Sequence, residues 1–460
     1  MKNAMMSPSL AEQQKSQFHV WTHNFKPERH ACSYYRIEVP LTQMMERDLA
    51  KVYEDTPNQS PETQKNSVLA LMFSDIMHQY SLSGEQTLHR YQSIKRKKPA
   101  MHGETLVVPP SIIYDVDDNA DFVHPFNYTF PTMGIRAYPS AKLLKPGDVL
   151  VYENAEGVPE ELWVDKETVY NDNVFDIQRN LYDMKVRHEV IRTADAATVS
   201  TRALATYFRD VIGQKNVYVF PNTIVPAHNE QFEVVRKPED DGIVRILWQG
   251  SVSHYIDWFP LREGLARIVE KYRGKVKFVI FGQLFPWVHN IIPEDMIEYH
   301  PWCLYEAYKL KRGLLNCDIN LCPLADDVFN RCKSAIKWYE ASILRTPEAT
   351  LAQRTEPFHE IEDNVTGLLF RDNEEFVQKL SALIDSPDLR TRLATAAKQW
   401  VLTNRTPDAT IPALFDFYTD VRARTKRDLG LSPVKTFSMA DMKALPKEVD
   451  KILGIQVVSR

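Results

Sequence analysis

Short apolar runs alternate with amphipathic stretches along the second half of the chain. The stretches at 259–273, 303–315, 334–345 and 374–385 have the spacing of helices. Between them lie apolar runs at 244–251, 276–283, 317–324, 347–353 and 366–370. Strands that are apolar on both faces and alternate with helices are typical of a parallel sheet covered on both sides. Because crossovers between parallel strands are right-handed, this half is predicted to be a Rossmann-like domain.

The first half of the chain repeats this pattern less regularly. Its candidate strands lie at 18–24, 67–75, 111–119, 148–154, 195–200 and 216–222, and its candidate helices at 34–50, 175–193 and 201–212. Four prolines within 120–147 predict an irregular excursion there. The stretch 223–243 is interpreted as a linker, and helical patterns return at 388–404 and 411–429.

These patterns predict an α/β protein with two Rossmann-like domains that face a central cleft, followed by C-terminal helices. We expect residues 1–225 to form the first domain and residues 226–405 the second. Residues 406–460, a helix and a tail, are expected to pack back on the first domain. In open α/β sheets, ligands bind at the carboxyl ends of the strands, so the site is expected in the cleft. This architecture alone does not assign a function.

Glycine is scarce, which narrows the ways in which this chain can bind phosphate. The 15 glycines among 460 residues form neither GxGxxG nor GxxxxGK[ST]. The two commonest glycine-based phosphate cradles are therefore absent. A phosphate would have to be held by helix termini, cations and isolated glycines.

Charge and cysteine content exclude several classes of protein. The net charge of −5 provides no global basic field for nucleic acid or an anionic membrane. The basic run 95–98 is the local exception, either as a solvated segment or as a phosphate-binding patch. Five cysteines without a CxxC pair predict reduced thiols and no zinc site. With no secretory signal and no membrane-spanning run visible, we expect a cytoplasmic protein.

The segment 317–342 is the most informative for chemistry. Its apolar strand ends near Leu324, and a helix is expected to begin near Ser334. Lys333, Lys337 and Glu340 are spaced i, i+4, i+7 and share one helix face. A helix N-terminus with two lysines favours an anion. Glu340, about 10 Å further along, suits a ribose beyond a diphosphate, although a solvated stripe of ion pairs has the same spacing.

A family resemblance is visible in this segment. The residues Phe329-Asn330-x-x-Lys333-Ser334, followed by Lys337-Trp338-Tyr339-Glu340-Ala341 and Pro347, resemble the donor-binding segment of GT-B glycosyltransferases. The resemblance is to glycosyltransferase family 4 (group 1), especially its phage and bacterial surface-glycan branches. Further similar segments follow in the family's order at 194–200, at Pro221-Asn222 with Phe232, at 247–251 and at 366–370. The resemblance implies the GT-B fold, a UDP- or GDP-sugar donor as the only cofactor, and retaining transfer without a metal.

Two departures from the family pattern affect the expected donor site. The family commonly carries a Glu-x7-Glu pair. Glu340 matches the second glutamate, which holds the nucleotide ribose in the family, and the first falls on Cys332. The family's arginine and lysine after the first donor-domain strand are missing as well. The expected donor-binding residues are therefore Gly250, Ser251, Ser253, Asn330, Ser334, Lys337 and Glu340.

Three residues are candidate catalytic groups. Lys333 is expected to stabilise charge on the leaving diphosphate. His254 is expected to contact phosphate as a neutral donor, with a helix-capping histidine as the alternative. Asp118 follows the strand SIIYDVDDN and is expected to orient the acceptor hydroxyl, with turn capping as the alternative. Clustered aspartates also suggest a metal, but the resemblance implies that none is needed.

We therefore expect a hexosyl- or pentosyltransferase that moves a sugar from a nucleotide-sugar to an acceptor hydroxyl. The acceptor is expected to be a hydroxymethylated pyrimidine in phage DNA or a bacterial surface glycan. If the chain is phage-encoded, it would act in the host cytoplasm. A non-catalytic GT-B subunit that binds a partner enzyme or acceptor is the alternative, which Cys332 and the missing basic pair suggest. A sugar-nucleotide epimerase is a third possibility. The chain is expected to be a monomer or a homodimer.

Overall fold

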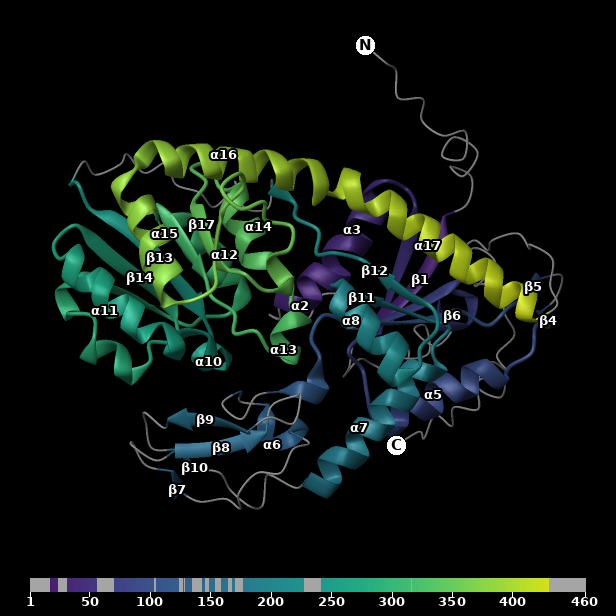
Figure 1. Cartoon of the computed structure of the whole chain (residues 1–460). Helices are drawn as coiled ribbons and strands as arrows, with labels where there is room; N and C mark the ends of the chain where they lie inside the picture. Colours follow the sequence, from purple (N-terminus) through teal and green to yellow (C-terminus); the bar gives the residue numbers. More distant parts are fainter. Residues whose placement is uncertain are drawn as a thin grey trace, which may run out of the picture.

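Two parallel sheets, each flanked by helices, make up the computed structural model of the chain (Figure 1). The structure describes residues 17–23, 31–55, 70–102, 105–123, 127, 129–134, 143–144, 149–153, 159–163, 168–169, 177–226, 241–315 and 317–429. Most of the predicted linker, residues 24–30 and the predicted tail at 430–460 lie outside the described residues.

The first sheet has six strands in the order β12-β11-β6-β3-β1-β2, all parallel to their neighbours. The strands are β1 (Phe18–His23), β2 (Ala50–Asp55), β3 (Ile76–Tyr80), β6 (Ser111–Val116), β11 (Ala196–Val199) and β12 (Val217–Val219). The flanking helices are α2 (Ala31–Ser33), η1 (Tyr34–Glu38), α3 (Val39–Glu46), α5 (Glu85–Arg96), α7 (Ile177–Thr193), α8 (Arg202–Tyr207) and η3 (Phe208–Ile212). Strands β1, β6 and β11 are buried along almost their whole length, as two-sided helix cover requires.

The strand predicted at 67–75 is wrong in its described part. Residues 70–73 are helical, and the strand follows as β3. The residues of β3 read IMHQY, in which His78 and Gln79 are both buried. A buried polar pair removes the apolar run by which such a strand is predicted. The structure tolerates His78 there because its ring nitrogens find partners within the domain.

The strand predicted at 148–154 forms, but it does not join the first parallel sheet. It is β8 (Val149–Glu153), which pairs antiparallel with β9 (Pro159–Trp163) in a two-stranded sheet. Two other small antiparallel pairs are β7 (Leu143–Leu144) with β10 (Thr168–Val169), and β4 (Ala100–His102) with β5 (Thr105–Val107). Strands β7 to β10 lie together as a small lobe apart from both large sheets (Figure 1).

The second sheet is also parallel, with the strand order β15-β14-β13-β16-β17-β18. Its strands are β13 (Val244–Gly250), β14 (Val276–Gly282), β15 (Ile297–Pro301), β16 (Ile319–Cys322), β17 (Ala349–Gln353) and β18 (Leu368–Phe370). All five predicted strands are present. The sequence analysis missed β15, an edge strand that is only partly buried and contains a glutamate and a histidine.

Helices of the second domain follow the predicted ranges closely. They are α10 (Tyr255–Trp258), α11 (Arg262–Lys271), α12 (Tyr305–Leu314), α13 (Val328–Arg331), α14 (Ile336–Ile343) and α15 (Asn373–Asp385). Helix α11 presents Leu265, Ile268 and Val269 to a core that also contains residues of β13 and β14. The apolar spacing visible in the sequence therefore corresponds to the packed face of this helix.

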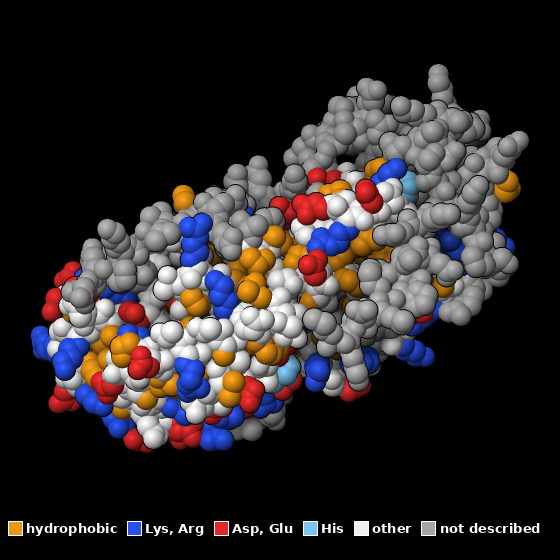
Figure 2. Space-filling view, turned by 90° about the horizontal axis from the view of Figure 1, so that it is seen from above, with side chains coloured by type: hydrophobic (Ala, Val, Ile, Leu, Met, Phe, Trp, Pro, Cys, Tyr) orange, Lys and Arg blue, Asp and Glu red, His pale blue; other side chains and the backbone are white. Residues whose placement is uncertain are grey.

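Two long helices end the described chain and connect the domains. Helix α16 (Pro387–Asn404) packs against α14 of the second domain, where Ala397 and Val401 join the apolar cluster of Trp338. Helix α17 (Pro407–Asp428) lies on the first domain, where Phe415 and Tyr418 are buried with residues of β1. Both helices run along one side of the molecule (Figure 1). On the face seen from above, the second domain carries interspersed acidic and basic side chains (Figure 2).

Candidate functional site

The candidate site lies where the strand order of the second sheet changes direction. Strands β14 and β15 extend from one side of β13, and β16, β17 and β18 extend from the other. Open α/β sheets bind ligands at the carboxyl ends of the strands at such a point, which here are the ends of β13 and β16. Two segments begin at these strand ends. One starts at Gly250, the last residue of β13, and the other runs from the end of β16 through α14. Together they contain nine of the ten residues predicted for the site.

Two glycines allow the carboxyl ends of β13 and β14 to approach closely. Gly250 and Gly282 are direct partners in the sheet. A Cβ on Gly250 would lie 2.8 Å from Cδ2 of His254. Gly282 has a φ of 114°, and a Cβ there would lie 2.3 Å from the carbonyl oxygen of Gly250. Both positions therefore require glycine, one for the packing of the histidine ring and the other for the backbone itself.

Gly282→Ala is expected to destabilise the protein more than Gly84→Ala. Both glycines have similar positive φ values, 114° and 102°, but a Cβ at Gly84 has nothing within 4 Å. Backbone strain alone costs about 1–3 kcal/mol. Gly282→Ala adds the collision with the Gly250 carbonyl, so its free energy of unfolding in urea should fall further. Equal losses in the two variants would contradict this account.

The loop after β13 is fixed by an indole pair. Trp248 on β13 stacks on Trp258 of α10, with ring centroids 3.7 Å apart and planes inclined by 13°. Both rings are buried. The stack holds the residues between them, among which Ser251 and Ser253 share a hydrogen bond of 2.7 Å between their hydroxyls. These two predicted donor-binding residues thus lie side by side just after the carboxyl end of β13.

Lys337 is the cation nearest to this loop. Its Nζ donates to the carbonyl oxygen of Gln249 at 2.9 Å and lies 3.2 Å from His254 Nε2. On the other side of the imidazole, Nδ1 lies 2.6 Å from Asp257 Oδ2. Burial, together with the charges of Lys337 and Lys333, lowers the pKa of His254 to about 3. The ring is therefore neutral, with its hydrogen on Nδ1 toward Asp257 and the lone pair of Nε2 toward the lysine.

Asn330 supports this arrangement from the segment after β16. Its amide Nδ2 donates to Asp257 Oδ1 at 2.7 Å and to the Ala325 carbonyl at 3.0 Å, and the side chain is buried. Asp257 also accepts from the Ala325 amide at 2.8 Å. Asn330, Asp257, His254 and Lys337 thus form one hydrogen-bonded chain that aims the ammonium group. Asn330 and His254 were predicted to bind the donor; in the structure the Asn330 amide nitrogen and both His254 ring nitrogens face protein partners.

Lys333 and Asp118 lie on opposite sides of the junction between the domains. Lys333 is half-buried, and its Nζ lies 4.7 Å from the centroid of the Phe329 ring. Burial and the neighbouring Asp117 raise the pKa of Asp118 to about 6, while the charge of Lys333 acts to lower it. Ser334, next to Lys333, accepts a hydrogen bond of 3.0 Å from Asn222 of the first domain. The structure thus brings one predicted group of the first domain to the predicted donor segment.

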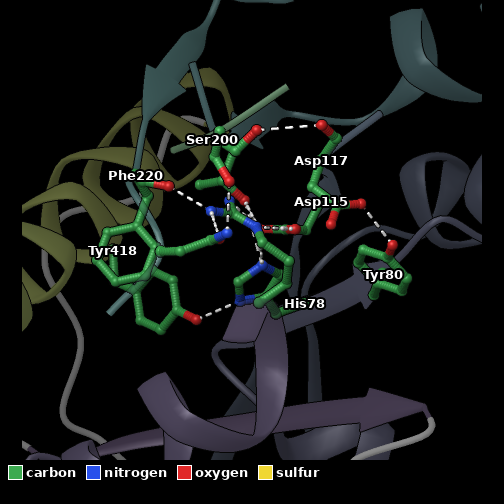
Figure 3. A network of polar contacts seen from close by, with 11 residues as sticks. His78, Tyr80, Asp115, Asp117, Ser200, Phe220 and Tyr418 are labelled. Carbon is green, nitrogen blue, oxygen red and sulfur yellow. Dashed lines mark hydrogen bonds and ion pairs between the residues drawn. The ribbon is translucent and has the colours of Figure 1, made fainter. Parts of the chain in front are cut away.

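The three aspartates at the end of β6, one on the strand and two after it, have separate environments. Asp117 accepts a hydrogen bond of 2.6 Å from the Tyr80 hydroxyl. Asp115 is fully buried and pairs with Arg36, whose Nε and Nη2 both donate at 2.8 Å. Figure 3 shows Asp115 with His78 and Tyr418 in a network that ties α17 to the first sheet. Asp115 is therefore part of the domain core, whereas the charge of Lys333 of the second domain acts on the pKa of Asp118.

Cys332 contacts the first domain directly. Thr201 Oγ1 donates to its carbonyl oxygen at 2.8 Å, and Asn119 Nδ2 lies 3.6 Å from its sulfur. Burial raises the pKa of the thiol to about 12, so it stays protonated. The position at which the resembled family has a glutamate is thus closed by first-domain side chains.

Glu340 lies further along α14 and is buried. Its Oε1 accepts from the Tyr35 hydroxyl at 2.6 Å and its Oε2 from the Tyr308 hydroxyl at 2.8 Å. Burial raises the pKa of this carboxyl, and the two hydroxyls oppose the shift. Neither tyrosine was predicted as a site residue, although the pair at 34–35 opens the helix predicted at 34–50. Glu348 follows Glu340 with the spacing of the family's Glu-x7-Glu pair, but its carboxylate pairs with Arg312.

The described residues form neither a metal-binding cluster nor a membrane-spanning helix. They contain no group of three or more histidine, cysteine, aspartate or glutamate side chains placed to hold a metal ion. Within the same residues, no helix combines the length and the apolar character needed to span a membrane.

Two Rossmann-like domains, joined by one connection and bridged again by α16 and α17, define the GT-B fold. Solved structures support this assignment. Sucrose-phosphate synthase from Thermosynechococcus elongatus matches with a TM-score of 0.53 and 9% identity over 88% of this chain and 99% of its own. HepE from Anabaena, in complex with UDP and glucose, matches with a TM-score of 0.51 and 12% identity over 87% and 99%. A glycosyltransferase from Rickettsia africae matches with a TM-score of 0.51 and 10% identity over 88% and 99%.

The fold prediction is therefore confirmed: the chain is an α/β protein with the GT-B fold. No protein-family model matches the sequence, and no curated protein matches it. At these identities the similarity shows the fold, and the function has to be argued from the site.

Proposed function

We propose that this protein is a glycosyltransferase that moves a sugar from a nucleotide-sugar donor to an acceptor hydroxyl. One observation carries the proposal. Lys337 and Lys333 lie at the start of α14, Lys337 donates to the Gln249 carbonyl at the end of β13, and Asp118 of the first domain lies within reach of the Lys333 charge. Two cations beside a helix start suit a diphosphate, and a carboxylate opposite suits a hydroxyl group. Two of the structurally similar proteins are a sucrose-phosphate synthase and a protein solved with UDP and glucose, which supports the same reading.

In the proposed reaction the protein acts mainly by positioning and by stabilising charge. The glycosidic bond between sugar and diphosphate breaks, and the new bond forms to the acceptor oxygen. Lys333 and Lys337 stabilise the charge that develops on the leaving diphosphate. As the resemblance implies, the sugar keeps its anomeric configuration, and a diphosphate oxygen takes the acceptor proton. Asp118 orients the acceptor hydroxyl, and Glu340 receives the ribose hydroxyls of a UDP- or GDP-sugar.

A panel of nucleotide-sugars tests the proposal directly. The purified chain should bind at least one UDP- or GDP-sugar and hydrolyse it slowly when no acceptor is present. Release of free sugar without epimerised donor would distinguish a transferase from an epimerase. If no nucleotide-sugar in the panel binds, the proposal is wrong.

The acceptor is proposed to be either a hydroxymethylated pyrimidine in DNA or a bacterial surface glycan. The basic run 95–98, which could bind DNA phosphates, begins at the end of α5. There Lys95 forms an ion pair of 2.6 Å with Asp195. A screen with both acceptors in the presence of donor separates the two. Transfer to DNA should add a sugar mass to the modified nucleoside, and duplex binding should weaken steeply with salt.

A non-catalytic GT-B subunit remains the second candidate because of one observation. Cys332, at the position of the missing glutamate, is engaged by Asn119 and Thr201 of the first domain. Such a subunit would bind a partner enzyme or acceptor without turning over any donor. Donor hydrolysis by the purified chain, abolished by Lys333→Ala, would exclude this candidate.

Donor affinity is expected to decrease as the pH rises through about 8. Burial, with the neighbouring charge of Lys333, lowers the pKa of Lys337 to about 8. Below that pH the ammonium is charged and attracts the diphosphate, and above it the amine is neutral. The dissociation constant of UDP, measured by calorimetry from pH 6.5 to 9.5, should rise by up to about tenfold per pH unit above 8. Lys337→Arg keeps its charge and should flatten this rise. A flat profile in the unsubstituted protein would contradict the role of Lys337.

A further inference from the structure

Four tyrosines meet where the two domains touch. Tyr34 and Tyr35 belong to η1 of the first domain, and Tyr305 and Tyr308 belong to α12 of the second. The ring centroids of Tyr305 lie 4.9 Å from Tyr34 and 6.0 Å from Tyr35. Tyr305 and Tyr308 stack at 5.9 Å. We call this group the tyrosine junction. Aromatic pairs of this kind contribute attraction beyond their buried area, so the group holds the domains together.

A lysine reinforces the junction. The Nζ of Lys309 lies 4.7 Å from the centroid of Tyr34 and 5.2 Å from that of Tyr305. One ring belongs to each domain, so the same cation attracts both sides of the contact. Lys309 therefore adds a cation–π attraction to the contact between the two domains.

Glu340 lies beneath the junction with both carboxylate oxygens occupied. The hydroxyl of Tyr308 reaches Oε2 from the same domain, at 2.8 Å. The hydroxyl of Tyr35 reaches Oε1 from the other domain, at 2.6 Å. Burial and the charge of Glu340 raise the pKa of both tyrosines well above the usual range. Both hydroxyls therefore stay protonated and act as donors.

We propose that Tyr35 competes with the ribose of the donor for Glu340. The inference rests on the proposed function, in which this carboxylate receives the ribose hydroxyls of a nucleoside diphosphate. Glu340 is buried and the Tyr35 hydroxyl covers Oε1, so a ribose hydroxyl that reaches this oxygen takes the place of Tyr35, and donor binding exchanges one hydrogen bond for the other. The bond that is given up joins the two domains. Tyr35 is thus an affinity-determining residue, and Tyr308 is a positioning residue that keeps hold of the carboxylate.

The test compares Tyr35→Phe with Tyr308→Phe. Each substitution removes one hydroxyl from the same carboxylate and keeps the ring that packs in the junction. UDP and inorganic diphosphate are titrated into the unsubstituted protein and both variants by calorimetry. Tyr35→Phe should bind UDP about 2- to 10-fold more tightly, the factor that corresponds to one hydrogen bond of ordinary net strength. Its affinity for inorganic diphosphate, which has no ribose, should stay unchanged. Tyr308→Phe should not bind UDP more tightly.

Three results for the variants would overturn the inference while leaving the proposed function in place. Unchanged or weaker UDP binding by Tyr35→Phe would show that its hydroxyl does not compete. A matching gain for inorganic diphosphate would indicate general loosening of the domains, and a matching gain in Tyr308→Phe would show that the interdomain origin is irrelevant. If neither the unsubstituted protein nor Tyr35→Phe binds any nucleotide, the proposed function fails and the inference fails with it. Failure of the inference alone leaves UDP binding by the unsubstituted protein intact.

Hydrogen exchange on the unsubstituted protein provides a second measurement that needs no variant. If UDP displaces Tyr35, peptides that cover residues 34–46 should exchange faster when UDP is added. Slower exchange of these peptides would mean that donor binding tightens the contact, and it would overturn the inference.

Discussion

Lys333→Ala is expected to slow sugar transfer by about 10²- to 10³-fold, the loss typical of removing one donor that stabilises developing negative charge. The residue is well suited to this test because its ammonium group packs over the Phe329 ring and is only half-buried. Its removal leaves the hydrogen-bonded chain from Asn330 to Lys337 intact. The loss should therefore appear in the rate of transfer more than in stability.

The measurement is the rate of transfer or of donor hydrolysis at saturating nucleotide-sugar, with thermal denaturation as the folding control. Lys333→Arg is the matched variant, because it keeps the charge over the same ring and should retain most of the activity. The Lys333→Ala variant should also raise the pKa of Asp118 above about 6, since the lysine charge acts to lower it. Full activity in Lys333→Ala would remove the residue from the catalytic machinery.

Arg36→Met is expected to lower the free energy of unfolding by about 3–5 kcal/mol, the usual consequence of leaving a buried charge without its partner. Arg36 and Asp115 have no exposed side-chain surface and share two hydrogen bonds of 2.8 Å. Burial alone would raise the pKa of Asp115, but the Arg36 charge and the bonds from Arg36 and His78 lower it. Without Arg36 the carboxylate must either stay charged in the core or take up a proton, and both cost free energy.

Urea denaturation at neutral pH measures this loss. The double variant Arg36→Met with Asp115→Asn should recover part of it, because the unpaired charge is then gone. As the control, Arg267→Met breaks an ion pair with Glu374 whose side chains are 47% and 78% exposed, and it should leave stability almost unchanged. A similar loss in the two single variants would show that burial of the Arg36 pair is not the cause.

The strands and helices of the second domain could be predicted because apolar residues recur along it with regular spacing. Each of its five predicted strands is a run of buried apolar residues, and helices such as α11 carry a clear apolar stripe. The strands that were missed or misplaced lack that signal for physical reasons. Strand β3 buries His78 among partners from three distant segments, and β15 is a half-exposed edge. Such partners come from tertiary structure, which no local pattern contains.

The candidate site was foreseen in part. Lys333 and Lys337 were recognisable because they flank a helix start after a buried strand. What the sequence could not reveal is which polar atoms are already occupied. His254 and Asn330 look like ligand donors in the sequence, but they turn toward Lys337 and Asp257. Glu340 looks available, but it accepts from tyrosines that lie 305 and 32 positions away along the chain. Pairings over such separations depend on the tertiary structure, and the pairing of Glu340 with Tyr35 also depends on how the domains meet.

Helices α16 and α17 also determine how one domain can move relative to the other. The chain crosses between the domains twice, once between residues 226 and 241 and once between α16 and α17. A body attached at two separate points can swing about the line that joins them, but it cannot slide away or turn freely about other axes. The two crossings therefore limit the relative movement of the domains to a rotation about the line that joins them. A single cut in the backbone between residues 226 and 241 would therefore leave the two halves held together only by noncovalent contacts, among them the packing of α17 on the first domain.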